Sequence, residues 1–279
     1  MSGMVGKKRK MARLLHSSVR PILCLAYDHG MQLGPIDGVK NPGEMISKAV
    51  ETEVSAIIMT PGVYVEYADL LSTPHAPAVI LRLDQTSMWR IGEDLGYEEG
   101  HTRQIATVEE AVRLGAEAVI SFMFFGHDTP ALETNSMEIA ARIAEQARKW
   151  GVVHICEPMA ARQGIATDVY DPDVIAFGAR IASEIGADIV KTDYTGDPGS
   201  FQEVTKEVEA PVLAAGGSRL DTDQEVLNVV ADIRDSGAAG ILFGRNIFQS
   251  PKPARLMKSI HSLLNEGAEE GAALRMTDG

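Results

Sequence analysis

The sequence has few cysteines, few aromatic residues and no long apolar segment. Cys24 and Cys156 are too few for a disulfide framework, and both lie in apolar runs where small buried thiols are expected. Aromatic residues make up 5% of the chain, and Trp89 and Trp150 lie far apart, so we interpret both as packing residues. The apolar run at 118–125 is much shorter than the ~20 residues of a membrane helix. These features argue against a disulfide-stabilised or membrane-spanning protein.

Positive charge is also in deficit. The chain has 26 Lys and Arg against 39 Asp and Glu, a formal net charge of -13. General binding to nucleic acids or anionic membranes is therefore disfavoured, because both need a positive surface. The basic run at residues 7–10 is either a nuclear address, a nucleic-acid patch or a solvated face, and we favour the solvated face. No apolar run follows it, so it is not a secretory signal, and we expect a cytoplasmic protein.

The chain is long enough for one large hydrophobic core. A chain of this size hides roughly three quarters of its unfolded surface, and α/β barrels often form single domains of ~250 residues. No Ser/Gly-rich linker or low-complexity segment divides the 279 residues. We therefore predict a single domain over residues 1–279, with a flexible tail from about residue 267.

Several segments repeat one pattern: an amphipathic helical stretch, a glycine, and a short run rich in Val, Ile and Ala. Gly115, Gly151, Gly186 and Gly237 occupy the glycine position, where helices commonly end in a left-handed turn. The apolar runs do not alternate cleanly with polar residues, which is typical of parallel strands covered on both faces. The pattern predicts eight strands, at residues 21–27, 55–60, 78–84, 118–124, 152–157, 188–193, 211–215 and 240–243.

Eight strands with intervening helices predict an α/β fold, the (β/α)8 TIM barrel, with a doubly wound open sheet as the alternative. Four helices are expected to start where a capping residue precedes proline, at Asn41-Pro42, Thr60-Pro61, Asp171-Pro172 and Ser250-Pro251. In a barrel, polar residues at the C-terminal strand ends line the active face. Here those positions hold Asp28, His29, Arg82, Asp84, Glu157, Lys191, Asp193, Gly216, Gly217, Ser218, Gly244, Arg245 and Asn246.

Lys191 follows an apolar run at 187–190, so a strand places its ammonium group. Such a lysine is either half of a structural ion pair or an amine that attacks a carbonyl to form a Schiff base. The second role needs a neutral amine, and lowering a lysine pKa from ~10.4 to near 7–8 costs about 4 kcal/mol. We expect desolvation, helped by the cation of Arg82, to supply this shift.

Asp28 and Glu157 are the expected carboxylates of the same site. Asp28 either orients substrate hydroxyls and the protonated imine or caps the turn before Gly30. A proline follows Glu157 and is expected to end its strand. An apolar setting would raise the Glu157 pKa and let this carboxyl group move protons near neutral pH. The alternative is that Glu157 only pairs with Lys191.

Two glycine-containing loops predict a phosphate site. Gly216, Gly217 and Ser218 follow the seventh strand, and Gly244 and Arg245 follow the eighth. Backbone N–H groups exposed by glycine next to a helix start bind anions, and barrels often hold phosphate on these two loops. Arg245 can add a charged contact. Such a local site explains how a protein of net charge -13 accepts an anionic ligand.

In their order and spacing, these motifs resemble the archaeal-type class I fructose-bisphosphate aldolases, which are related to deoxyribose-phosphate aldolase. The resemblance runs from about residue 7 to 264 and rests on Asp28-His29-Gly30 with Gly34-Pro35, Lys191 within KTDYTGD, Gly216-Gly217-Ser218, and GRNIFQ at 244–249. It implies a Schiff base at Lys191, an active-site Asp28, and phosphate contacts from Gly217, Ser218, Gly244 and Arg245. It also suggests a homo-oligomer.

The resemblance departs at the fifth strand. Where these aldolases and the related aminodideoxyheptulosonate synthases have a tyrosine as acid/base, this chain has Glu157, which is more similar to class I tagatose-bisphosphate aldolases. A carboxyl group can move the same proton, but fructose bisphosphate does not follow as the substrate. We expect His29, Arg82 and Asp84 to contact substrate, the last two at its far end. Tyr194 should point away from the barrel axis.

We therefore predict a class I aldolase that acts without cofactor or metal on a phosphorylated, fructose-bisphosphate-like ketose, with dihydroxyacetone phosphate as the ketone half. Lys191 forms the iminium, Glu157 moves protons and Asp28 orients hydroxyls. Within the same family, the alternatives are an aminodideoxyheptulosonate synthase and a coenzyme A-dependent thiolase of a phosphorylated autoinducer-2 breakdown product. Outside it, they are a sugar-phosphate sensor and a metal-dependent lyase. The potential metal ligands are Asp28, His29, His154, Cys156 and Glu157, of which His154 and Cys156 should face the helices.

Overall fold

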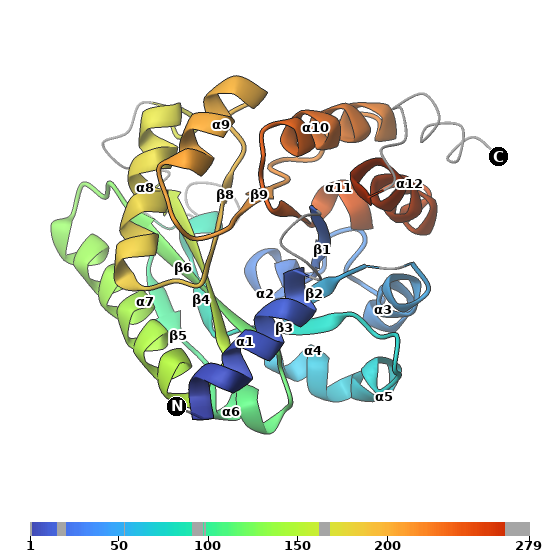
Figure 1. Ribbon diagram of the computed structural model, residues 1–279, viewed down its shortest axis with the longest axis horizontal. Helices are drawn as coiled ribbons and strands as arrows, with labels where there is room; N and C mark the ends of the chain where they lie inside the picture. The colour runs from blue at the N-terminus through green and yellow to red at the C-terminus, as the bar shows by residue number, and fades with distance from the viewer. Residues whose placement is uncertain are drawn as a thin grey trace.

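The computed structural model describes residues 2–15, 21–52, 54–90, 97, 99–161 and 168–265. Its parallel strands close into a barrel in the order β1-β10-β9-β8-β7-β6-β3-β2, with helices around it (Figure 1). The barrel strands are β1 (Ile22–Ala26), β2 (Ala56–Met59), β3 (Ala78–Arg82), β6 (Ala118–Phe125), β7 (Val153–Ala160), β8 (Ile189–Asp193), β9 (Val212–Ala215) and β10 (Gly240–Phe243). Each of the eight predicted strands is one of these, so the (β/α)8 barrel is confirmed and the open sheet is wrong.

Three of the four predicted helix starts agree with the structure. The described helices are α1 (Ser2–Leu15), α2 (His29–Leu33), α3 (Pro42–Val50), α4 (Pro61–Glu66), α5 (Ala68–Leu71), η1 (Met88–Arg90), α6 (Val108–Arg113), α7 (Pro130–Trp150), α8 (Pro172–Ile185), α9 (Pro198–Lys206), α10 (Asp223–Asp235), α11 (Arg245–Phe248) and α12 (Pro253–Asn265). The predicted starts at Pro42, Pro61 and Pro172 are confirmed. The predicted start at Pro251 is wrong, because the Ser250 hydroxyl accepts from the Lys252 N–H (3.1 Å) and holds a turn ahead of α12.

Strand β7 also continues further than predicted. It was expected to end at Glu157, before a proline, but it extends to Ala160. The Ala161 N–H donates to Phe125 O of β6 (2.8 Å), so alternation places the Pro158 nitrogen on the β8 side. Pairing with β8 has already ended at Cys156. The missing proline N–H therefore breaks no ladder hydrogen bond.

A small hairpin between β3 and β6 was not predicted. Strand β4 (Asp84–Thr86) pairs antiparallel with β5 (Thr102–Gln104), and η1 follows β4 directly. Asp84 therefore belongs to this hairpin, and its predicted place in the third barrel strand is wrong. The hairpin brings Trp89 of η1 over the barrel, where it contacts Phe122 and Phe124 of β6.

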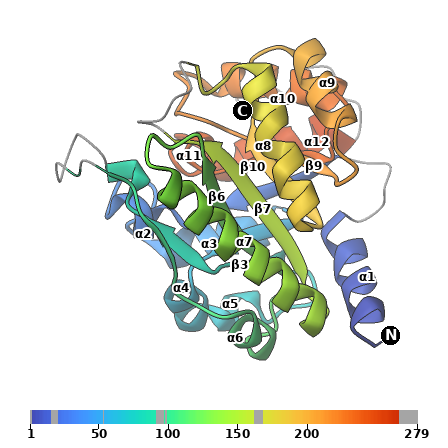
Figure 2. The same cartoon turned by 90° about the vertical axis from the view of Figure 1, so that its left-hand side faces the viewer.

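Helix α1 covers the N-terminal end of the barrel. Leu14 is buried in the barrel interior with the first residues of several strands, such as Ile22 and Ile189. Lys7 pairs with Asp188 at 2.8 Å, just before β8. The basic run at residues 7–10, which is predicted to be solvated, therefore also contacts the barrel through Lys7. Figure 2 shows α1 on the side of the barrel away from α2.

The core has an inner layer inside the barrel and outer layers between strands and helices. Cys24 lies in the inner layer and Cys156 in the outer one, both free and buried as predicted. None of the described helices is both long and apolar enough to cross a membrane. The predicted C-terminal tail, from about residue 267, lies outside the described residues.

Candidate active site

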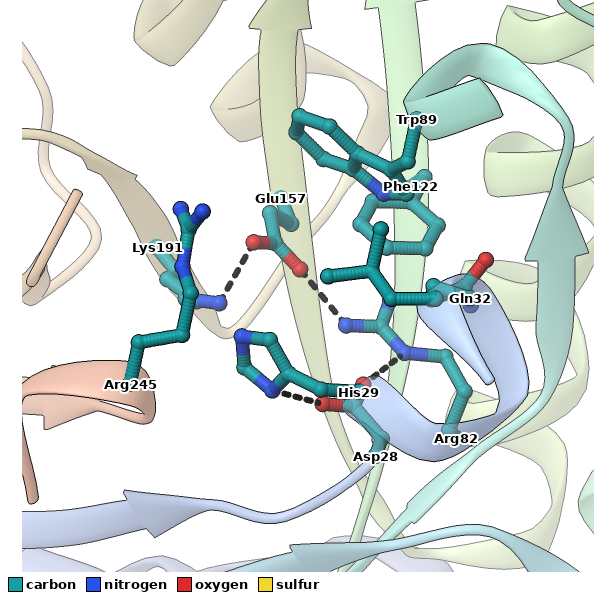
Figure 3. A pocket seen from close by; sticks show the side chains of 10 residues that line it. Asp28, His29, Gln32, Arg82, Trp89, Phe122, Glu157, Lys191 and Arg245 are labelled. Atoms are coloured by element: carbon teal, nitrogen blue, oxygen red, sulfur yellow. Dashed lines mark hydrogen bonds and ion pairs between the residues drawn. The ribbon is translucent and has the colours of Figure 1, made fainter. Parts of the chain in front are cut away.

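A cavity of about 290 Å³ lies at the C-terminal ends of the barrel strands. Its polar lining comes from the segment after β1 and from β3, β7, β8 and α11, which the barrel brings to one end. The described residues that line it are Asp28, His29, Gln32, Leu33, Arg82, Trp89, Phe122, Glu157, Lys191 and Arg245 (Figure 3). The predicted residues among them, from five separate segments of the chain, therefore do converge on one site.

Lys191 and Glu157 form a buried ion pair at the base of this cavity. Strand alternation in β8 turns Lys191 inward together with Ile189, and β7 turns Glu157 inward together with Ile155. The Lys191 Nζ donates to Glu157 Oε1 at 2.5 Å. The ion-pair alternative for both residues is thus present in the structure, and both side chains also face the cavity.

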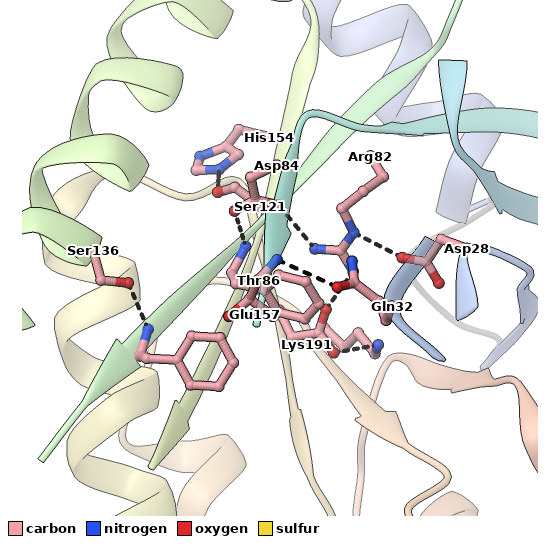
Figure 4. A network of polar contacts seen from close by, with 12 residues as sticks. Asp28, Gln32, Arg82, Asp84, Thr86, Ser121, Ser136, His154, Glu157 and Lys191 are labelled. Carbon is pink, nitrogen blue, oxygen red and sulfur yellow. Dashed lines mark hydrogen bonds and ion pairs between the residues drawn. The ribbon is translucent and has the colours of Figure 1, made fainter. Parts of the chain in front are cut away.

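Arg82 connects the two predicted carboxylates of the site (Figure 4). Its Nε donates to Asp28 Oδ2 at 2.7 Å and its Nη2 to Glu157 Oε2 at 2.6 Å. Its Nη1 lies 3.4 Å from Asp84 Oδ1, and the Phe122 ring covers the guanidinium at 3.8 Å. Three carboxylates compensate this buried charge. Its donors are therefore committed to protein groups, which leaves it poorly placed for the predicted role at the far end of a substrate.

The cations of this network lower the pKa of Glu157, whereas the sequence predicts a raised pKa. Burial raises the pKa of Glu157, but the cations of Lys191 and Arg82 outweigh burial and hold the pKa below its usual value. The predicted raised pKa is therefore wrong for the unliganded site.

Asp28 belongs to the ion network and does not cap a helix. It precedes α2, but its side chain makes no capping hydrogen bond. Burial raises its pKa, and the larger combined effect of Arg82, His29 and Lys191 lowers it to about 2. Asp28 is thus a permanent carboxylate at neutral pH.

Asp84 lies behind the cavity wall. It is fully buried and accepts a hydrogen bond from the Phe122 N–H at 2.8 Å. Burial, only partly offset by Arg82, raises the pKa of Asp84 to about 7. Asp84 does not line the cavity. Its contacts therefore fit a role in holding Arg82 in place better than the predicted contact with substrate.

His29 packs against the loop that follows β10. Its ring meets Phe248 edge-on with centroids 5.1 Å apart, and a Cβ on Gly244 would lie 2.3 Å from His29 Cε1. Burial lowers the His29 pKa to about 4, so the imidazole is neutral at pH 7. Gly244 is therefore required by the close approach of this ring.

The two predicted phosphate loops are held together by side chains of α11. Arg245 Nη2 donates to Gly217 O at 2.9 Å, and Asn246 Nδ2 donates to Gly216 O at 2.7 Å and to Ser218 O at 3.2 Å. Asn246 Oδ1 also accepts from the Leu220 N–H. The sequence predicts a place for Asn246 at the active face but no role. In the structure, Asn246 holds the loop after β9 in position.

Four lining residues were not identified from the sequence: Gln32, Leu33, Trp89 and Phe122. Trp89 was interpreted as packing, and it does pack on Phe122, with centroids 6.2 Å apart, but it also lines the cavity. Side chains alternate along β6, and Ile120 points into the barrel, so Phe122, two residues later, could have been predicted to point inward as well.

The remaining metal-ligand types lie elsewhere. His154 and Cys156 face the helices as predicted, and His154 Nε2 lies 2.9 Å from Ser121 Oγ. Tyr194 packs edge-on against Phe201 in the outer layer, away from the axis as expected. The described part of the chain holds no group of three His, Cys, Asp or Glu side chains able to bind a metal.

Comparisons with known proteins find aldolases and related synthases similar to this chain. The model of the DeoC/LacD family aldolases matches residues 22–250. An uncharacterized aldolase of Saccharolobus solfataricus is 33% identical over 98% of this chain and 99% of its own. A 2-amino-3,7-dideoxy-D-threo-hept-6-ulosonate synthase of Halobacterium salinarum is 32% identical over 96% and 95%. An archaeal fructose-1,6-bisphosphate aldolase, solved with its catalytic lysine bound to a carbinolamine intermediate, has a TM-score of 0.79 and 28% identity over 92% and 99%.

Proposed function

Because this chain belongs to the DeoC/LacD family of aldolases and is a class I, Schiff-base aldolase, we propose that Lys191 is the nucleophile and that the substrate is a ketose 1-phosphate. Cleavage releases dihydroxyacetone phosphate and an aldehyde. The observation that carries this proposal is the Lys191–Glu157 pair in the cavity, since Lys191 is the only lysine among the described residues that line it.

The pair supplies the neutral amine that attack on a carbonyl requires. Proton transfer along the 2.5 Å hydrogen bond from Lys191 to Glu157 leaves an uncharged amine and a carboxylic acid. The transfer also removes one of the two cations that hold the Glu157 pKa down, so Glu157 keeps the proton more readily. The amine then attacks the C2 carbonyl, and one of its protons passes to the carbonyl oxygen to give the carbinolamine. Glu157 gives its proton to the carbinolamine hydroxyl, which leaves as water.

The resulting iminium accepts the electrons of the breaking bond between C3 and C4. Glu157, again a carboxylate, takes the proton of the C4 hydroxyl, and the products are a neutral enamine and an aldehyde. Asp28 is the group we assign to the substrate hydroxyls and to the iminium charge, because its low pKa keeps it an acceptor. Protonation of the enamine and hydrolysis then release dihydroxyacetone phosphate and restore Lys191.

The phosphate is assigned to the loops around Gly217 and Arg245. Arg245 lines the cavity, and its contact with the Gly217 carbonyl joins the two loops. Asn246 holds the Gly216 and Ser218 carbonyls and so keeps this part of the site in place before an anion arrives. Arg245→Met should raise the KM for a phosphorylated ketose about 10-fold or more, with a smaller change in kcat.

Trapping with borohydride tests the proposed nucleophile. The protein is incubated with dihydroxyacetone phosphate, reduced, digested and mapped by mass spectrometry. We expect one adduct, on the peptide that holds Lys191, and none in Lys191→Met. Lys206→Met, which changes an exposed lysine of α9, is the matched control and should retain the adduct. Absence of an adduct on Lys191, or loss of turnover on adding EDTA, would contradict the mechanism.

A further inference from the structure

The cavity has two chemically different ends. Lys191 and Arg245 lie at one side, and Trp89, Phe122 and the amide of Gln32 form the other side (Figure 3). Leu33, which follows Gln32 in α2, also lines the cavity. The ring centroids of Trp89 and Phe124 are 5.9 Å apart, so the indole belongs to a cluster of aromatic side chains. If the phosphate lies at Arg245 and the carbonyl at Lys191, the far half of the substrate meets this aromatic side.

Among the residues that the structure describes, positive charge is scarce at the aromatic side of the cavity. The described basic side chains that line the cavity are Lys191, Arg245, Arg82 and His29. Lys191 becomes the iminium, and Arg245 is joined to Gly217 at the opposite side. Arg82 is compensated by three carboxylates, and His29 is neutral at pH 7. None of these groups is placed to compensate a second phosphate beside Trp89.

Gln32 provides a specific hydrogen-bond donor at this side. Its side chain is buried, and its Oε1 accepts from the Thr86 N–H at 3.3 Å. That contact determines the orientation of the amide, because rotation would bring two donors together. The Nε2 group has no hydrogen-bond partner in the described part of the chain. A buried donor without a partner is costly, so an oxygen atom of a ligand would be favoured there.

On the basis of the proposed function, we propose that the aldehyde half is uncharged and unphosphorylated and carries an apolar substituent. The substituent packs on Trp89 and Phe122, and an oxygen of this half accepts from Gln32 Nε2. In the synthetic direction, C3 of the enamine bonds to the aldehyde carbon, and the aldehyde oxygen takes the proton from Glu157. Water then hydrolyses the iminium, so the product is a ketose 1-phosphate with an apolar end.

The test compares three aldehydes in addition to dihydroxyacetone phosphate: phenylacetaldehyde, D-glyceraldehyde and D-glyceraldehyde 3-phosphate. We expect kcat/KM to be at least 10-fold higher for phenylacetaldehyde than for the phosphorylated aldehyde, with D-glyceraldehyde between them. Equal rates, or preference for the phosphorylated aldehyde, overturn this proposal. Failure of borohydride trapping at Lys191 would instead overturn the proposed function, so the two failures are distinguishable.

Two tryptophan variants locate the effect. Trp89→Ala should lower kcat/KM for phenylacetaldehyde about 10-fold relative to the trapping rate of dihydroxyacetone phosphate measured on the same variant. Trp150→Ala is the control, because Trp150 ends α7 ahead of β7, at the opposite end of the barrel, and should change neither rate. Equal losses in the two variants contradict the assignment of Trp89.

Two further variants keep the proposal testable if Trp89→Ala folds poorly. Gln32→Leu removes the buried donor and should raise the KM for the aldehydes about 10-fold. Leu33→Arg introduces a cation at the aromatic side and should raise kcat/KM for D-glyceraldehyde 3-phosphate relative to phenylacetaldehyde. An unchanged KM for the aldehydes in Gln32→Leu, together with an unchanged ratio in Leu33→Arg, would show that this side of the cavity does not contact the aldehyde.

Discussion

Lys191 Nζ and Glu157 Oε1 are 2.5 Å apart, so the proposed nucleophile and the proposed proton carrier share one hydrogen bond. The second oxygen of Glu157 accepts from Arg82 at 2.6 Å. Glu157 is therefore linked to both cations, and its proton affinity changes whenever the charge of Lys191 changes. In the proposed mechanism, this coupling lets Glu157, whose pKa is lowered in the unliganded site, act as an acid once Lys191 is neutral.

Glu157→Gln should lower kcat about 10²- to 10⁴-fold, because an amide cannot carry the proton between Lys191 and the substrate. Single-turnover trapping with dihydroxyacetone phosphate would show the loss at Schiff-base formation, and steady-state cleavage would show it over the full cycle. Glu138→Gln, on the exposed face of α7, is the control and should leave both rates unchanged. A kcat within threefold of the parent would refute the assigned role.

Arg82→Met should destabilise the fold by about 3–5 kcal/mol, because three buried carboxylates lose their common partner. Urea unfolding measures this free energy. Arg113→Met is a matched control: Arg113 pairs with Glu109 one helical turn away on an exposed face, and its loss should cost about 0.5 kcal/mol or less. Similar costs in the two variants would show that the network does not stabilise the barrel.

Gly244→Ala should lower stability by about 1–3 kcal/mol and displace His29, because the added Cβ would lie 2.3 Å from the His29 ring. Thermal unfolding and the KM for the phosphorylated ketose report the two effects. Gly62→Ala is the control, since no atom lies within 4 Å of its added Cβ in α4. Its stability should stay equal or rise slightly, and a parallel loss in both variants would argue against the close approach.

His154 should make the protein less stable as pH falls from 6.5 toward 3. Burial and the nearby cations lower its folded pKa to about 3, so the unfolded chain binds a proton in this window that the folded chain excludes. Stability from this group is complete above 6.5 and declines by about 1.4 kcal/mol per pH unit. His154→Asn should flatten the urea-derived slope by that amount, whereas His75→Asn, at an exposed position, should not. Identical slopes in the parent protein and both variants would contradict the inference that the folded protein keeps a proton off His154.

The barrel could be predicted because each repeated unit has its own local signal. A helix ends at a glycine such as Gly186, and a short apolar run such as Ile189 to Val190 follows it. The hairpin of β4 and β5 has no such signal, because each strand has three residues, too few for a hydrophobic period. Trp89, which this hairpin carries, was therefore assigned to packing alone.

The positions of the site could be predicted, but its charge state could not. Barrel geometry places Asp28, Arg82, Glu157 and Lys191 at one end of the strands. The pKa of Glu157 depends on Arg82, which is 75 residues away in sequence, and the order of residues does not show which atoms pair. An apolar strand alone indicates a raised pKa for its carboxyl group, and the cations of Lys191 and Arg82 on other strands reverse this shift.

Helix α1 and the packed interior of the barrel close the N-terminal end of the strands. By covering the N-terminal end of the barrel, with Leu14 packed inside it, α1 leaves the C-terminal mouth for both entry and exit. The two products of cleavage then share one route. In the proposed mechanism the aldehyde, which is not bonded to the protein, leaves first, and the ketone half at Lys191 leaves after hydrolysis. The covalent bond thus sets the order of release, and the closed N-terminal end makes both products leave by the mouth through which the substrate enters.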